Sequence, residues 1–118
     1  MGVFTVPIEV SDLEGIRSER IDTLVDTGAS HTRIPRPILE RLGVVPHERM
    51  PFRLADESVI EYDLGEAQIR IDGRFRYSPV SFGEEGSQPL LGASTLEIFG
   101  LGMNPVDKRL VPVTGIFL

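Results

Sequence analysis

Glycine and proline recur along the whole chain and separate short apolar runs. The chain has 118 residues, of which 12 are Gly and 9 are Pro. Both residue types interrupt regular structure, Gly through its conformational freedom and Pro because it lacks an amide donor. Their spread, without clustering in one low-complexity linker, predicts many short strands joined by turns. The expected extended segments are 3–10, 21–25, 50–54, 59–62, 68–77, 110–113 and 116–118.

The clearest hairpin signal is the dipeptide Asp72-Gly73. It suits a type I′ turn, because both central positions of that turn need positive φ. Apolar residues alternate with polar ones on both sides, which predicts one dry face and one wet face. The predicted dry face holds Ile69, Ile71, Phe75 and Tyr77. The predicted wet face holds Arg70, Arg74 and Arg76.

Two short helices are expected among the strands. The first spans residues 35–42, with Pro near its first turn and Gly43 placed to end it. In the second, Ser94 stands three residues before Glu97, which is the spacing of a capping box, and Gly100 follows as a stop signal. We therefore predict an all-β fold with one or two short helices, organised as a single domain over residues 1–118.

Composition removes several classes of function. The chain has 12 Lys and Arg against 18 Asp and Glu, a net charge of −6, which argues against nucleic acid or an anionic membrane as partner. It has no Cys and two His, so we expect no disulfide, no thiol chemistry, no metal site and no cofactor. The N-terminal residues lack the basic region and long apolar run of a signal peptide or membrane span. We expect a cytoplasmic protein.

Residues 24–30 carry the most informative motif and read Leu-Val-Asp-Thr-Gly-Ala-Ser. The apolar pair favours a buried strand, at whose end Asp26 is held in a dry but reachable position. Thr27 brings a hydrogen-bonding hydroxyl, and Gly28 allows a sharp turn and the close approach of a ligand. An Asp-Thr-Gly tripeptide alone is also typical of a surface turn, and only its apolar and small neighbours favour a catalytic loop.

This motif resembles the signature of the retroviral-type (retropepsin-like, clan AA) aspartic peptidases, two apolar residues followed by Asp-Thr-Gly-Ala. Residues 90–97 read Leu-Leu-Gly-Ala-Ser-Thr-Leu-Glu and resemble the second element of that family, an apolar pair and a glycine before a short helix. Residues 54–58 stand at the place of its flap hairpin. The resemblance covers about residues 3–113, is strongest to small single-domain prokaryotic forms, and implies a retropepsin-like acid protease barrel.

The resemblance implies a homodimeric aspartic endopeptidase. Such hydrolysis needs two carboxyl groups that share a proton, and the dyad of aspartic proteases is the well-known example of this coupling. The chain has no second Asp-Thr/Ser-Gly, so the second acid would come from an identical chain. Asp26 would then be the catalytic acid and base, Thr27 would brace the two loops across the dimer axis, and Gly28 would contact the substrate backbone.

The resemblance also implies a peptide-binding surface. The residues expected to meet the side chains of a peptide or protein substrate are Ala29, Leu54, Ala55, Asp56 and Leu90. The apolar segments 3–6 and 110–118 would pair across the dimer interface in such a protein. They are equally typical of edge strands that pack on their own core, and both interpretations stay open.

The chain departs from the family pattern at two places, and the first of them motivates an alternative function. The flap segment contains no Gly. Ala93 stands where many relatives have an arginine, and the acid that pairs with this arginine is absent as well, which is consistent with a variant of the fold. The alternative is a non-catalytic peptide-binding or dimerisation module of the same fold. A hydrolase triad using Ser30 and His31 is disfavoured, because no Gly-x-Ser-x-Gly elbow accompanies it. A group of acids near the N-terminus is more typical of a solvated face than of a cation site, and it comprises Asp12, Glu14, Glu19 and Asp22.

Overall fold

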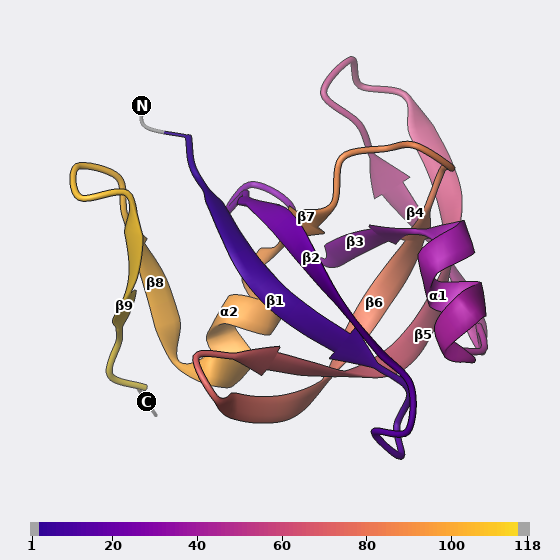
Figure 1. Ribbon diagram of the computed structural model, residues 1–118. Coiled ribbons are helices and arrows are strands. Elements are labelled where there is room, and N and C mark those ends of the chain that lie inside the picture. Colours follow the sequence, from indigo (N-terminus) through magenta and orange to yellow (C-terminus); the bar gives the residue numbers. More distant parts are fainter. Residues whose placement is uncertain (1–2, 116–118) are drawn as a thin grey trace.

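Strands dominate the computed structural model, which describes residues 3–115 (Figure 1). The elements are β1 (Thr5–Ser11), β2 (Ser18–Val25), β3 (Thr32–Pro35), α1 (Arg36–Leu42), β4 (Glu48–Arg53), β5 (Val59–Ile71), β6 (Arg74–Gly83), β7 (Leu90–Leu91), α2 (Ala93–Phe99), β8 (Leu101–Asn104) and β9 (Arg109–Pro112). The expected mainly β fold with two short helices is confirmed. The extended segment expected at 116–118 lies outside the described residues.

The main sheet closes into a barrel. Its strands are hydrogen-bonded in the order β1-β2-β7-β3-β6-β5, and β5 returns to pair with β1. The contacts of β2 with β7 and of β3 with β6 are parallel, and the remaining contacts in this ring are antiparallel. Closure pairs the strand edges of the ring that would otherwise be free. Strand β4 continues the sheet beyond β5, and the turn between them projects away from the barrel (Figure 1).

The barrel interior is apolar. Its most deeply buried side chains have no exposed surface and come from strands far apart in the chain, among them Val10, Ile34, Ile69, Val80 and Leu91. Helix α1 closes one side by burying Leu39 and Leu42. It ends as predicted at Gly43, whose φ of 83° lets its amide donate to Glu40 O while Val44 N donates to Leu39 O.

The β5–β6 hairpin has the predicted turn but not the predicted faces. Asp72 and Gly73 have φ of 49° and 80°, as a type I′ turn requires. The two-residue loop makes Ile71 the direct partner of Arg74, and directly paired residues share a face. The apolar positions of the two arms are therefore out of phase, and Phe75 and Tyr77 lie on the exposed face with Arg70. The predicted dry face was wrong for these two aromatic residues.

Arg74, like Arg76, does not share the face of Arg70 as predicted, because the two pair with Ile71 and Ile69. The Arg74 guanidinium lies 5.6 Å from the centre of the Phe99 ring, and Nη2 donates to Phe99 O at 3.1 Å. A carbonyl in the last turn of a helix has no partner within the helix, so this bond caps α2 at its C-terminus. Gly100, with φ of 67°, ends the helix as predicted.

The predicted capping box at the start of α2 is wrong. The helix begins two residues earlier than that motif requires, with Gly92 and not Ser94 as its N-cap, and it has no side-chain cap. Ser94 lies inside the first turn, and its hydroxyl is buried without a hydrogen-bond partner among the described residues. The spacing of Ser94 and Glu97 occurs here within the helix, and other groups satisfy the first helical amides.

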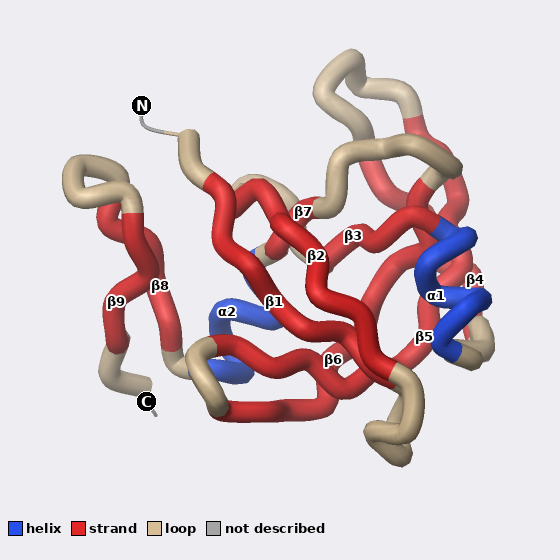
Figure 2. Tube along the Cα trace, in the orientation of Figure 1, coloured by secondary structure: helices blue, strands red, loops and turns tan. Residues whose placement is uncertain are grey.

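Strands β8 and β9 form a separate two-stranded hairpin to one side of the barrel (Figure 2). Leu101, Met103 and Leu110 pack against the core but remain partly exposed. Within residues 3–115, neither helix has the length or the apolar content to cross a membrane.

Candidate active site

Asp26 directly follows the buried end of β2. Its amide donates to Leu91 O at 3.0 Å, which ties it to β7, and Ala29 N donates to Asp26 O at 3.1 Å. The carboxylate is oriented by the loop itself, because Gly28 N donates to Asp26 Oδ1 at 3.0 Å. A Cβ at position 28 would lie 3.3 Å from the same oxygen. Glycine therefore keeps the approach to this carboxylate open.

The loop after Asp26 is fastened to the first turn of α2. Ala93 N donates to Ala29 O at 2.8 Å, and Ser94 N donates to Ser30 O at 3.0 Å. The first amides of any helix lack partners within the helix, and here the loop carbonyls supply them. The two motifs that stand apart in the sequence, at 24–30 and 90–97, thus form one bonded unit.

A buried hydroxyl network lies under this unit. Thr95 Oγ1 is 2.5 Å from Thr32 Oγ1 and 2.9 Å from Ser78 Oγ, and Thr32 Oγ1 accepts from Gly92 N at 3.0 Å. The three hydroxyl residues have no exposed surface, so each bond replaces a lost contact with water. Sequence reasoning missed this network, because its members are spread over three elements and each alone looks like an ordinary strand or helix residue.

Gly92 is fixed by contact with the loop. A Cβ at this position would lie 2.4 Å from the carbonyl carbon and oxygen of His31 and 2.8 Å from Thr32 N. These are backbone atoms and cannot move aside independently. The position therefore requires glycine for close packing, although its φ of −97° is open to any residue.

A cleft of about 700 Å³ opens beside Asp26, between the Asp26 loop (residues 26–30) and the β4–β5 hairpin. Six of the eight residues predicted for the site line it, and these are Asp26, Gly28, Ala29, Leu54, Ala55 and Leu90. Three aromatic rings that also line the cleft are in edge-to-face contact. The centre of the Phe52 ring lies 5.2 Å from that of His31 and 5.5 Å from that of Tyr62. The cleft is thus largely apolar beside its carboxylate.

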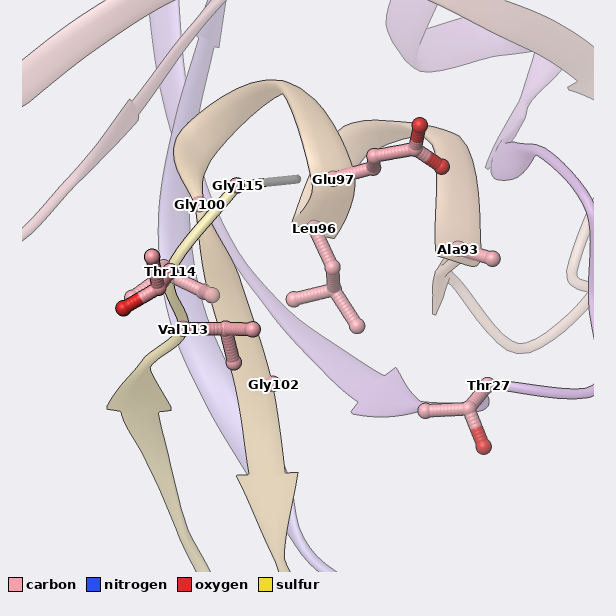
Figure 3. A pocket seen from close by; sticks show the side chains of 10 residues that line it. Thr27, Ala93, Leu96, Glu97, Gly100, Gly102, Val113, Thr114 and Gly115 are labelled. Carbon is pink, nitrogen blue, oxygen red and sulfur yellow. The ribbon is translucent and has the colours of Figure 1, made fainter. Parts of the chain in front are cut away.

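Thr27 lies elsewhere than the rest of the predicted site. Thr27 lines a second hollow of about 390 Å³, between the Asp26 loop, α2 and the end of the β8–β9 hairpin. Figure 3 shows Leu96 of α2 pointing into this hollow, with Thr27 on one side and Val113 on the other. Thr27 therefore faces away from the cleft and toward the hairpin side of the molecule.

Asp56 does not line the cleft; it shapes the turn of the flap hairpin. Its Oδ1 accepts from Ser58 N at 3.0 Å and from Ser58 Oγ at 2.5 Å. These bonds favour the ionised carboxyl group and lower the pKa of Asp56 below its ordinary value of 3.8. Glu57 takes the left-handed conformation, with φ of 73°, that a glycine would adopt more cheaply. The turn thus forms without glycine.

His31 and Asp12 have structural partners. His31 Nδ1 lies 3.0 Å from Ser30 Oγ, and no carboxylate pairs with this ring within residues 3–115. Asp12 Oδ1 accepts from Ile16 N at 2.8 Å and from Arg17 N at 3.1 Å, so it holds its own loop. No group of three or more His, Asp or Glu able to hold a metal ion occurs in this part of the chain.

Sequence reasoning also missed Arg33 and Tyr62 in the cleft wall. Strand alternation offered a signal for Arg33. Thr32 and Ile34 are both buried, so Arg33 between them must face the opposite side, toward the cleft. Tyr62 lies opposite Met50 of β4, and both line the cleft.

A closed barrel with an Asp-Thr-Gly loop facing a hairpin flap defines the retropepsin-like class. The family model described as "gag-polyprotein putative aspartyl protease" matches residues 15–97, which is more than half of the chain. The chain belongs to this family. Among solved structures it is similar to the EIAV protease complexed with the inhibitor HBY-793, with a TM-score of 0.57, 17% identity, and coverage of 82% of this chain and 88% of that chain. The structural likeness shows the shared fold. No curated protein sequence matches.

Proposed function

We propose that the protein is a homodimeric aspartic endopeptidase, in which a water molecule is activated between two Asp26 carboxyl groups, one from each chain. The observation that carries this proposal is the Asp26 carboxylate, oriented by the Gly28 amide at the side of a peptide-sized cleft. The family and the single Asp-Thr-Gly motif support the same reaction.

The chemistry follows from two carboxyl groups at close range. Two like charges a few ångströms apart are costly, so the pair holds one proton. The ionised Asp26 takes a proton from water as the water oxygen attacks the peptide carbonyl carbon. The neutral Asp26 of the other chain donates its proton to the carbonyl oxygen. Collapse of the tetrahedral intermediate breaks the C–N bond, and the amine leaves with a proton from the acid that accepted it from water. The other Asp26 takes a proton back from a hydroxyl of the intermediate as the new carbonyl forms, which restores the pair.

The surface on the β8–β9 side of the molecule is suited to contact with a second copy of the chain. Thr27 faces this side, and within residues 3–115 the β8–β9 sheet has two strands, with partly exposed apolar residues. Val113, which directly follows β9, is 54% exposed. Val25 N donates to Phe4 O at 3.1 Å, so segment 3–6 also contacts its own chain. A symmetric dimer that joins the two Asp26 loops would cover this surface.

Replacement of Asp26 by Asn tests the reaction. A peptide-library digest from acidic to neutral pH, with a hydroxyl-containing transition-state mimic as inhibitor, should show cleavage by the natural chain and none by Asp26→Asn. Asp22→Asn is the matched control, because Asp22 is exposed on β2 and has no described partner. Cleavage that survives in purified Asp26→Asn protein would rule out the proposed reaction.

Mixed dimers test the two-chain site. The natural chain and Asp26→Asn are refolded together in varying proportions. If both acids are needed, activity follows the square of the natural fraction, because only dimers of two natural chains cleave. A linear dependence would mean that one Asp26 per dimer is enough, and would contradict the shared site.

The structure of the flap turn supports one alternative function, that of a non-catalytic peptide-binding or dimerisation module. This turn is fixed by its own hydrogen bonds, with Glu57 in the conformation usually left to glycine. A stiff flap would bind peptide and hinder the opening that turnover needs. Peptide binding without inhibitor-sensitive cleavage in the same library would favour this alternative over the endopeptidase.

A further inference from the structure

The cleft differs in charge from the rest of the chain. The whole sequence has a net charge of −6. Among the described residues that line the cleft, however, Asp26 is the sole acid, while His31, Arg33 and Arg53 are basic. A low-dielectric cleft concentrates such a local excess of positive charge. The cleft is therefore suited to a ligand with negative charge.

Arg33 is held in a defined position in the cleft wall. Its neighbours across β3 are Leu90 on β7 and Ser81 on β6, and both line the same cleft. Its aliphatic stem takes the space of a side chain at Gly83, where a Cβ would lie 2.9 Å from Arg33 Cγ. Its Nη2 donates to Gln88 O at 3.0 Å. The guanidinium is thus fixed before any ligand arrives.

Arg33 has no ion-pair partner within residues 3–115, whereas Arg53 lies 3.8 Å from Glu57. Its Nε atom is buried and has no acceptor. Glu84 is a nearby carboxylate whose pKa is lowered by a backbone hydrogen bond first, then by the Tyr62 hydroxyl and the charge of Arg33, but it makes no ion pair with Arg33. The buried Nε atom offers no surface to a ligand, so the part of the guanidinium that lines the cleft is where a carboxylate can bind. Hydrogen bonds between a guanidinium and a carboxylate are among the strong ones, because both groups are charged.

We propose that Arg33 binds a carboxylate of the substrate, so that the cleft selects peptides with an acidic group at the position that meets Arg33. The inference rests on the proposed function in taking a peptide as the ligand. Phe52 and Leu90 surround this position with apolar surface, where a charged pair is screened less than in open water. The acidic group is a Glu or Asp side chain or the C-terminal carboxylate of the peptide.

Binding to the Asp26→Asn protein tests this selectivity without requiring turnover. The probes are fluorescent octapeptides with amidated C-termini, in which Glu, Gln or Lys occupies each position in turn. At one position the Glu peptide should bind about tenfold more tightly than the Gln peptide, as expected for hydrogen bonds to a charged group. Matched free-acid peptides without Glu or Asp distinguish a C-terminal carboxylate from a side chain.

Arg33→Gln should remove this preference and leave the affinity for the Gln peptide nearly unchanged. Arg76→Gln is the control, because Arg76 is exposed on β6 and has no described partner. Gly83→Ala provides a second variant that keeps the charge but displaces the Arg33 stem, and it should weaken the same preference. If Arg33→Gln does not fold, as judged by circular dichroism, the Gly83→Ala result decides.

The proposal would be overturned if a folded Arg33→Gln protein kept the preference for the Glu peptide. Where Gly83→Ala decides, an unchanged preference in that variant would overturn it in the same way. The absence of any preference in the Asp26→Asn protein would also overturn it. The outcome is separable from that of the proposed function. Selective binding together with no cleavage by the natural chain would leave Arg33 as the specificity residue and reject the endopeptidase. Cleavage by the natural chain without a preference for acidic peptides would support the endopeptidase and reject Arg33 as the specificity residue.

Discussion

The Asp26 loop (residues 26–30) and the flap hairpin face the same cleft but are stabilised in different ways. The loop around Asp26 is bonded to residues more than sixty positions away, through β7, α2 and the Thr32–Thr95 pair. The flap turn is closed by its own residues, with Leu54 N donating to Ser58 O and Asp56 accepting from Ser58. The groups that need exact placement are thus fixed by the buried core. The turn of the flap depends instead on local, exposed bonds within residues 54–58.

The largest test of this contrast is Gly92→Ala. The added methyl group would overlap the backbone of His31, so the loop and α2 could no longer pack together. We expect a loss of about 3 kcal/mol or more in the free energy of unfolding, measured with urea. Gly115→Ala is the control, because a Cβ there meets no atom within 4 Å. Equal stability of the two variants would show that the loop does not depend on this contact.

A smaller effect is expected from Thr95→Val. The change keeps the shape of the side chain but removes the hydroxyl that joins Thr32 to Ser78. Leaving two buried hydroxyl groups with fewer partners should cost about 2 kcal/mol in the free energy of unfolding. Thr5→Val, at an exposed position on β1, should change it little. If both variants unfold alike, the buried network does not stabilise the loop.

The smallest effect concerns the flap and its response to acid. The pKa of Asp56 is lowered, first by the Ser58 hydroxyl and then by the Ser58 amide. The ionised form therefore stabilises the turn at pH values above the ordinary 3.8, and this contribution is lost as the pH falls through the lowered value. Hydrogen exchange at Ser58 should speed up there relative to exchange in the barrel.

Asp56→Asn is the matched variant for this acid response. Its side chain has no charge to lose, so the flap should exchange with the same relative protection at every pH. An acid response in Asp56→Asn equal to that of the natural chain would assign the effect to another group. A barrel that loosens together with the flap would contradict the contrast between the two regions.

Features that depend on contiguous residues could be predicted from the sequence. The turn at Asp72-Gly73 and the end of α1 at Gly43 each follow from local backbone preferences. The hairpin around residues 54–58 was expected from the family resemblance. Predictions failed where the relation between segments mattered. The hairpin faces were wrong because register across the turn sets the phase. The cap at Ser94 was wrong because loop carbonyls already satisfy the helix amides.

The amino-acid order alone was enough to identify the Asp26 loop, the number of such loops per chain and the mainly β character, because these depend on neighbouring residues and on composition. Folding decided which distant groups meet. Arg33 enters the cleft, Thr27 faces the other side and Thr95 reaches Thr32 only after the barrel closes. Contacts of this kind depend on strand register and closure of the sheet, which are properties of the whole chain that no short segment contains.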